Sequence, residues 1–181
     1  MKRRNFIKKS AFGASAAIVV GMTSCVTDES PVQETTVIDS LKSMTTNVTP
    51  ISTEERKSRI KRAQQLMKEN GLEAILLDAG TSLNYFTGLS WWPSERPMIA
   101  VIPVSGDVSY VCPAFEEPRL HKKISIGKNV IAWEEDESPY QQIGNALKAS
   151  GISKGKIGLE ERFRYFILNG LQKDAPNYQY V

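Results

Sequence analysis

Residues 98–112 read MIAVIPVSGDVSYVC, two apolar runs separated by the turn-forming tripeptide Ser105-Gly106-Asp107. This pattern predicts a β-hairpin with strands from Met98 to Val104 and from Val108 to Cys112. On both sides of the hairpin, short apolar runs alternate with helical patterns. That alternation predicts an α/β fold, and the hairpin makes the sheet partly antiparallel. We therefore expect a mixed sheet flanked by helices.

The segment before the hairpin predicts a helix, a strand and a second helix. Ser52 to Glu55 fits a capping box, in which Ser52 accepts from the third amide of the helix and Glu55 reaches back. Apolar residues then recur at helical spacing over 53–69, and Gly71 supplies a left-handed stop. The next elements are a buried strand at 72–77 and a brief helix that Thr81 or Ser82 caps and that ends at 86.

The segment after the hairpin continues the alternation of helices and strands. Its expected elements are a helix at 115–124, a strand at 129–133, a helix capped by Ser138 and ending at 149, a strand at 156–159, a helix at 162–171 and an extended segment from 178. Residues 51–181 thus form the globular domain, which is long enough to enclose one hydrophobic core.

The first 25 residues have the pattern of an export signal. Five basic residues within positions 1–9 precede an apolar stretch from Ala11 to Met22. As a helix this stretch spans about 18 Å, less than the roughly 30 Å hydrocarbon core; a permanent transmembrane anchor is the alternative. Arg3 and Arg4 lie in a segment that resembles the twin-arginine motif, which predicts export across a bacterial inner membrane in the folded state.

Met22-Thr23-Ser24-Cys25 resembles a lipobox, which predicts that Cys25 is lipidated and holds the protein in the periplasm or at the cell envelope. An incidental cysteine near a cleavage site is the alternative. Residues 26–50 are rich in Ser and Thr and lack aromatic residues, which predicts a flexible linker. The N-terminal basic residues exceed the whole formal charge of +3. The remainder is therefore net acidic, and no nucleic-acid partner is expected.

Most familiar catalytic sites are excluded by composition and motif content. The chain has one histidine, His121, so it cannot form a Cys₂His₂ site, a His₃ site or an HExxH helix. It contains no nucleophile elbow, Walker A loop or dinucleotide-binding glycine motif. Two cysteines exclude a disulfide scaffold. We predict no catalytic residue and no metal ligand here; if the protein belongs to a metalloenzyme, most of the metal site lies elsewhere.

Three weaker candidates have simpler interpretations. Cys112 and His121 could form a thiol–imidazole pair, but Cys112 ends an apolar strand and fits a core position. His121 lies among basic residues and is expected on a helix surface. The acidic run 134–137 is expected to complement the positive end of the following helix rather than hold a metal ion, because adjacent side chains diverge.

Residues 84–97 form the most unusual segment, because Trp91, Trp92 and Arg96 lie together in a stretch without regular periodicity. Aromatic residues beside arginine are typical of binding hot spots, and a planar guanidinium can bind a carboxylate through two hydrogen bonds. The alternative is structural: both tryptophans pack over a sheet edge while Arg96 forms a local ion pair.

A resemblance to a known family rests on several motifs in one order: Asn84 to Gly88, Ser94 to Arg96, the strand from Ile99 to Val104, Val111 to Glu117, and Ile157 to Glu160. Together they resemble the N-terminal domain of the creatinase, prolidase and aminopeptidase P family, over residues 51–181. The resemblance implies a ribonuclease H-like α/β layer. The pieces at 113–117 and 158–160 look most like bacterial Xaa-Pro peptidases.

The resemblance also implies a second domain of pita-bread fold, in which two Asp, one His and two Glu hold two divalent metals (manganese, cobalt or zinc). None of these ligands has a counterpart here, and the chain ends where that domain is expected to begin. In the family the N-terminal domain mediates dimer or tetramer contacts and narrows access to the active site. Arg96 matches an arginine that creatinase lends to the neighbouring subunit, so Arg96, with Trp91 or Trp92, is expected to reach the partner's substrate.

The interpretation favoured by the sequence is the N-terminal, non-catalytic portion of an exported, lipid-anchored Xaa-Pro metallopeptidase. Its expected partners are its own catalytic domain or a split partner chain, a second copy, and a proline-containing peptide. A creatinase-type amidinohydrolase is less favoured, because Ser94 stands where creatinase has an aromatic residue. The remaining alternatives are a stand-alone binding or oligomerisation module and, more weakly, an exported solute-binding lipoprotein.

Overall fold

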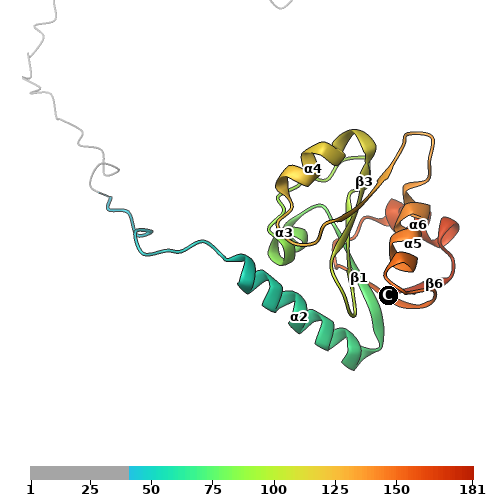
Figure 1. Cartoon of the computed structure of the whole chain (residues 1–181), viewed down its shortest axis with the longest axis horizontal. Coiled ribbons are helices and arrows are strands. Elements are labelled where there is room, and N and C mark those ends of the chain that lie inside the picture. The colour runs from blue at the N-terminus through green and yellow to red at the C-terminus, as the bar shows by residue number, and fades with distance from the viewer. Residues whose placement is uncertain (1–40) are drawn as a thin grey trace, which may run out of the picture. The chain divides into compact units, whose positions relative to one another are not determined.

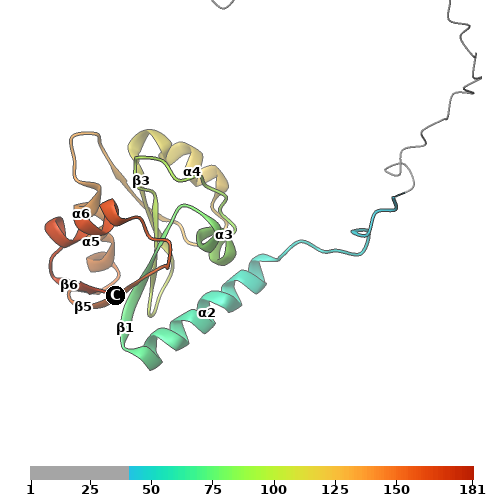
Figure 2. The same cartoon turned by 180° about the vertical axis from the view of Figure 1, so that it is seen from behind.

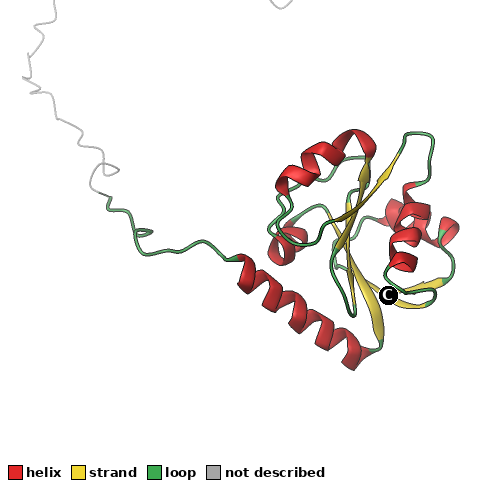
Figure 3. Ribbon diagram, viewed as in Figure 1, coloured by secondary structure: helices red, strands yellow, loops and turns green. Residues whose placement is uncertain are grey.

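The computed structural model describes residues 41–181, of which residues from Val48 onward belong to one compact unit. The described residues contain a six-stranded sheet in the order β4-β3-β2-β1-β5-β6 (Figures 1 and 3). The strands are β1 (Leu72–Asp78), β2 (Ile99–Pro103), β3 (Ser109–Pro113), β4 (Asn129–Trp133), β5 (Gly155–Leu159) and β6 (Tyr178–Tyr180). The helices are α2 (Thr53–Asn70), α3 (Thr81–Thr87), η2 (Ala114–Glu116), α4 (Glu117–Lys123), α5 (Pro139–Ala149) and α6 (Tyr165–Asp174).

The predicted mixed sheet is confirmed. β2 pairs antiparallel with both of its neighbours, β1 and β3. The β3–β4, β1–β5 and β5–β6 pairs are parallel. All five residues of β2 and all five of β3 are buried. Helices cover both faces of the sheet, which is why these strands are apolar apart from Ser109 and do not alternate with polar residues.

Two hydrophobic clusters lie on opposite faces of the sheet, and Figure 2 shows the helices that cover these faces. Helices α2, α3 and α4 pack on one face, where Ile60, Leu83 and Leu120 are buried. Helices α5 and α6 pack on the other face, where Leu147 and Leu171 are buried. Alternate residues of β2 point into the two clusters, as the two-residue repeat of a strand requires.

Helix α2 begins and ends where the sequence predicted. The Ser52 hydroxyl accepts from the Glu55 amide, and Gly71 ends the helix in the left-handed conformation with φ 66°. The other interaction of the predicted capping box, in which the Glu55 side chain reaches back to the start of the helix, is wrong. The Glu55 carboxylate pairs instead with Arg59 one turn later. That interaction adds an i,i+4 ion pair on the helix surface.

Two other helix starts differ from expectation. The residue before α3 is Gly80, which makes no side-chain cap, so neither Thr81 nor Ser82 caps this helix. Helix α6 begins at Tyr165, whereas Arg162 was the predicted start. Residues 160–164 instead form a turn whose side chains contribute to the site described below. Helix α5 is capped by Ser138 and ends at Ala149, as predicted.

The described residues contain no helix that is both long enough and apolar enough to cross a membrane. The export motif at Arg3 and Arg4, the apolar stretch 11–22 and Cys25 all lie outside residues 41–181, as does most of the predicted linker. Residues 41–47 lack helix and strand and contain a local hydrogen bond between the hydroxyls of Ser43 and Thr45.

Candidate binding cleft and its rim

A cleft of about 580 Å³ opens at the carboxyl ends of β1 and β5. Chain connections diverge at this point: β1 leads to α3 on one face of the sheet, and β5 leads to α6 on the other. Such a switch between neighbouring strands leaves a crevice at the sheet edge in open α/β folds. The lining residues come from the end of β1, the start of α3, the loop 90–93 and the turn after β5: Asp78, Ala79, Gly80, Thr81, Ser82, Asn84, Ser90, Trp91, Trp92, Pro93, Glu160, Arg162 and Arg164.

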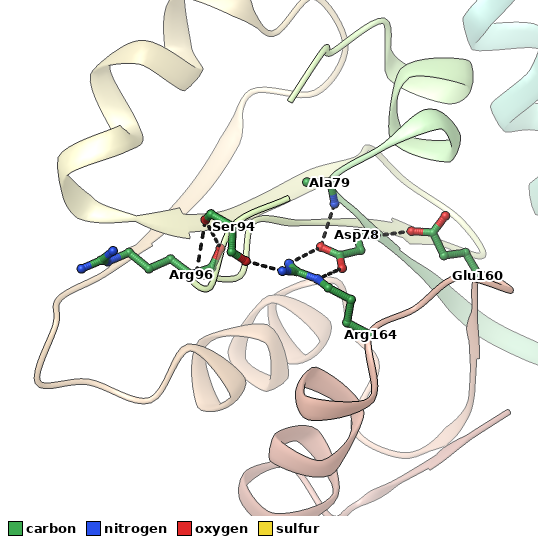
Figure 4. A network of polar contacts seen from close by, with 6 residues as sticks. All are labelled: Asp78, Ala79, Ser94, Arg96, Glu160 and Arg164. Atoms are coloured by element: carbon green, nitrogen blue, oxygen red, sulfur yellow. Dashed lines mark hydrogen bonds and ion pairs between the residues drawn. The ribbon is translucent and has the colours of Figure 1, made fainter. Parts of the chain in front are cut away.

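The floor of the cleft is an ion pair between Asp78 and Arg164 (Figure 4). Arg164 donates from Nε to Oδ2 at 2.5 Å and from Nη2 to Oδ1 at 2.9 Å. The Asp78 side chain is only 3% exposed. A two-point contact of this kind fixes the orientation of both groups and compensates the carboxylate for the loss of water.

Two further hydrogen bonds tie Asp78 to the strands around it. Its Oδ1 accepts from the backbone amide of Ala79 at 2.8 Å. Its own backbone amide donates to Oε1 of Glu160 at 2.7 Å, which links the end of β1 to the end of β5 (Figure 4). The floor is therefore a connected polar network in which the buried carboxylate has several partners.

Arg164 also fixes the loop that carries the tryptophans, which we call the tryptophan loop (residues 90–97). Its Nη1 donates to the backbone carbonyl of Ser94 (Figure 4). Within the loop, the Ser94 hydroxyl accepts from the backbone amide of Arg96 at 3.2 Å. One guanidinium thus joins β1, the start of α6 and the tryptophan loop.

The two tryptophans occupy different environments. Trp91 is 8% exposed, and the Arg119 guanidinium lies over its ring at 4.5 Å. Trp92 is 86% exposed and lines the rim of the cleft. Trp91 therefore matches the structural alternative of packing over the sheet edge, whereas Trp92 is available for binding.

Arg96 is held at the surface by two carboxylates and does not line the cleft. Its Nε donates to Glu135 at 2.6 Å, its Nη1 pairs with Glu95 at 2.5 Å, and its guanidinium lies 5.5 Å from the centre of the Phe115 ring. The hydrogen bond to Glu135 is the main cause that raises the pKa of Arg96. Figure 4 shows its side chain extending away from the Asp78–Arg164 pair. Trp92 thus lines the cleft while Arg96 does not, and Arg96 forms the local ion pair of the structural alternative with Glu95.

The weaker candidates lie where their simpler interpretations placed them. Cys112 is fully buried, and burial raises the pKa of its thiol to about 12. His121 is exposed on α4, with Nε2 3.4 Å from Glu117. Two members of the acidic run 134–137 have specific partners. Glu135 binds Arg96, and Glu137 accepts from the backbone amide of Glu134 at 2.9 Å.

The residues that form the cleft floor, Asp78, Glu160 and Arg164, were not among the site residues predicted from the sequence. Glu160 appeared only at the end of a family motif, and Asp78 lies just after the predicted strand 72–77. A usable signal was present: both acids end short apolar runs, and neighbouring parallel strands end at the same sheet edge. The pairing of Asp78 with Arg164 could not be foreseen, because 86 residues separate them.

Within residues 41–181, no group of three or more His, Cys, Asp or Glu side chains is arranged to hold a metal ion. The described part of the chain therefore offers no ligand set for the two divalent metals that the resemblance implies. The cleft acids do not supply one, because the Asp78 carboxylate is already paired with Arg164.

A mixed sheet with helices on both faces and a crevice at its switch point defines a small α/β domain. The sequence pattern described as the Creatinase/Prolidase N-terminal domain matches residues 59–181. The chain therefore belongs to the creatinase/prolidase N-terminal domain family.

Relatives of known sequence or structure agree with this assignment. An uncharacterised peptidase of Schizosaccharomyces pombe is 34% identical over 138 residues, which cover 67% of this chain and 29% of the relative. The crystal structure of a dipeptidase from Pyrococcus horikoshii has a TM-score of 0.57 at 28% identity, covering 68% of this chain and 33% of that one. The chain thus spans about a third, or less, of these relatives.

An isolated domain gives a comparison of matching size. The creatinase/prolidase N-terminal domain of an X-Pro dipeptidase from Streptococcus pyogenes has a TM-score of 0.57 and is 20% identical. The match covers 68% of this chain and 93% of that domain. This similarity shows that the two chains share a fold.

Proposed function

We propose that this chain is the non-catalytic N-terminal portion of an exported Xaa-Pro metallopeptidase, and that it takes part in oligomerisation and controls substrate access. The complete enzyme hydrolyses the peptide bond before proline. Two divalent metals, if bound by another domain or chain, would supply Lewis-acid chemistry for that hydrolysis. The residues described here bind and orient, and they perform no bond-breaking step.

The observation that supports this role best is the defined position of Arg96. Arg164 donates a hydrogen bond to the Ser94 carbonyl in the tryptophan loop, and this contact holds the backbone that carries Arg96 in place. The Arg96 guanidinium is partly exposed, as are both carboxylates that contact it. Exposed ion pairs contribute only about 0–1 kcal/mol, so a substrate carboxylate can replace them at small cost.

The substrate side of the proposal follows from the chemistry of that guanidinium. A planar cation at a loop tip suits the terminal carboxylate of a short peptide, and it does so through two parallel hydrogen bonds. The Arg96 of one subunit then reaches the substrate of its neighbour in a dimer or larger oligomer. Trp92, exposed in the same loop, adds an apolar surface.

Export and anchoring belong to the same proposal and rest on the N-terminal sequence. Arg3 and Arg4 direct the folded protein across the bacterial inner membrane, and the lipid on Cys25 holds it at the envelope in the periplasm. The segment 26–50 then serves as a tether. A stand-alone binding or oligomerisation module, without any catalytic partner, is the second candidate.

The test is kinetic and uses the complete enzyme, with its catalytic domain on the same chain or supplied by a partner chain. Arg96→Ala should raise KM for an Xaa-Pro dipeptide about tenfold, because a charge-assisted hydrogen bond is lost. Arg62→Ala, an exposed substitution on α2, is the matched control. Unchanged kcat and KM in Arg96→Ala would contradict the proposal. So would hydrolysis of the dipeptide by residues 1–181 alone in the presence of manganese.

A further inference from the structure

The cleft at the ends of β1 and β5 contains polar groups that the fold does not use. Arg162 lines the cleft, and no carboxylate or carbonyl of residues 41–181 binds its guanidinium. Glu160 uses Oε1 to accept from Asp78, while its Oε2 accepts no hydrogen bond from the same residues. One cation and one carboxylate oxygen of the cleft lining are thus left without a partner among residues 41–181.

The other charged pair of the cleft is internally balanced. Asp78 and Arg164 neutralise each other through their two hydrogen bonds. The lining residues carry two acids and two arginines in all, so the cleft has no net formal charge. A neutral site with one unopposed cation and one unopposed anion is complementary to a zwitterion rather than to a phosphate or a metal ion.

An apolar surface completes the set of groups. The Trp92 side chain lines the same cleft at 86% exposure, next to Pro93. The volume of about 580 Å³ falls in the usual range for small-molecule sites. Its position outside the carboxyl ends of neighbouring strands, at a topological switch point, is where open α/β sheets bind ligands.

We infer that this cleft binds a small zwitterion, a free amino acid or a dipeptide with an apolar side chain or a proline ring. The ligand carboxylate binds Arg162, its ammonium group binds Oε2 of Glu160, and its apolar part packs on Trp92. This site goes beyond the proposed role of Arg96 and does not depend on it, because Arg96 does not line the cleft.

The floor of the cleft favours binding because it is already ordered. Glu160 is positioned by its hydrogen bond to the Asp78 amide, and the tryptophan loop is positioned by Arg164. A ligand therefore orders few additional groups, which reduces the entropic cost of binding. Arg162 itself is exposed, so replacing it should leave the fold intact.

The experiment titrates the full chain with L-leucine, L-proline and glycyl-L-proline, followed by calorimetry and tryptophan fluorescence. At least one of these ligands should bind saturably. Prolinamide lacks the carboxylate and N-acetylproline lacks the ammonium group, so each should bind at least about tenfold more weakly. The ratio of affinities between proline and glycyl-proline distinguishes a free amino acid from a peptide as the ligand.

Variants test whether binding occurs in this cleft. Arg162→Gln should weaken binding about tenfold or more, and Trp92→Ala should both weaken it and remove the fluorescence change. The matched control Arg62→Gln should bind as the unchanged chain does, and thermal unfolding should show that all variants are folded. The inference is overturned if none of the three zwitterions saturates the protein. It is equally overturned if Arg162→Gln binds them with unchanged affinity.

Discussion

The Asp78 carboxylate at the end of β1 receives two hydrogen bonds from the guanidinium of Arg164, which stands just before α6. The same guanidinium binds the Ser94 carbonyl in the tryptophan loop. Three segments that lie far apart in the sequence therefore meet at one buried ion pair. Because the carboxylate is nearly inaccessible to water, this pair determines both the local stability and the position of the loop.

The first prediction concerns this ion pair. Arg164→Ala leaves the Asp78 carboxylate buried without its partner, so the free energy of unfolding should fall by about 3 kcal/mol. Urea denaturation measures the change. Arg164→Lys keeps the charge but loses the two-point contact, and it should recover only part of the loss. Equal stability of the alanine variant and the unchanged chain would show that the pair is not structural.

The second prediction concerns the contact between α5 and α6. A Cβ at Gly170 would lie 2.4–2.5 Å from ring atoms of Tyr140, which is too close for non-bonded carbon atoms. Gly170→Ala should therefore destabilise the domain by about 1–3 kcal/mol through overpacking. Thermal unfolding measures the effect. The double variant with Tyr140→Ala should show less than the sum of the two single losses, and strict additivity would argue against a steric cause.

The third prediction concerns Cys112. Burial, the largest cause, and the nearby acids Glu117 and Glu116 together raise the pKa of its thiol from 9 to about 12. At pH 8 the folded protein should therefore not react with a disulfide reagent, whereas the urea-unfolded protein should. In a chain carrying Cys25→Ser, Cys112 is the remaining cysteine, so any reaction with the reagent reports on Cys112. Rapid modification of the folded chain would contradict this.

The same shift predicts a pH dependence of stability. The folded state holds the proton of the Cys112 thiol more tightly than the unfolded state does. The resulting contribution to the free energy of unfolding is therefore fully present below pH 9. It should decline as the pH rises from 9 toward 12, and Cys112→Ala should remove that part of the decline. Urea denaturation of the two proteins in this pH range measures the difference. Parallel stability curves would show that the thiol does not contribute.

The fourth prediction concerns the carboxylates that hold Arg96. Glu135 occupies the same guanidinium that the proposed function assigns to a substrate carboxylate. Glu135→Gln in the complete enzyme should therefore lower KM for an Xaa-Pro dipeptide by about two- to fivefold, the range expected for an exposed ion pair. Asp136→Asn, a neighbouring exposed acid, is the control and should leave KM unchanged. A raised KM in Glu135→Gln would show that Glu135 assists binding.

The local chemistry of the chain was sufficient to predict most of the elements. The cap at Ser138, the stop at Gly71 and the hairpin around Gly106 depend on neighbouring residues, so they can be recognised without a structure. The start of α6 was misplaced, because Arg162 and Arg164 are good helix formers, whereas the contacts of Arg164 with Asp78 and Ser94 come from distant segments.

The cleft was harder to predict than the fold. The tryptophan loop stood out by composition, yet the sequence could not show that Trp91 is buried under Arg119 while Trp92 is exposed. The partner of Arg96 was unforeseen for the same reason, since Glu135 comes from a loop 39 residues away. Such contacts depend on how strands are ordered in the sheet, which the periodicity of a single segment does not encode.

The central claim, that Arg96 serves the active site of a neighbouring subunit, is tested most directly by mixing two defective forms of the complete enzyme. One form carries Arg96→Ala with an intact metal site, and the other carries an intact Arg96 with its metal ligands removed. In hybrid dimers the intact metal site should receive Arg96 from its neighbour, so KM should return to the value of the unchanged enzyme. A KM that stays as high as in the Arg96→Ala enzyme would contradict the claim.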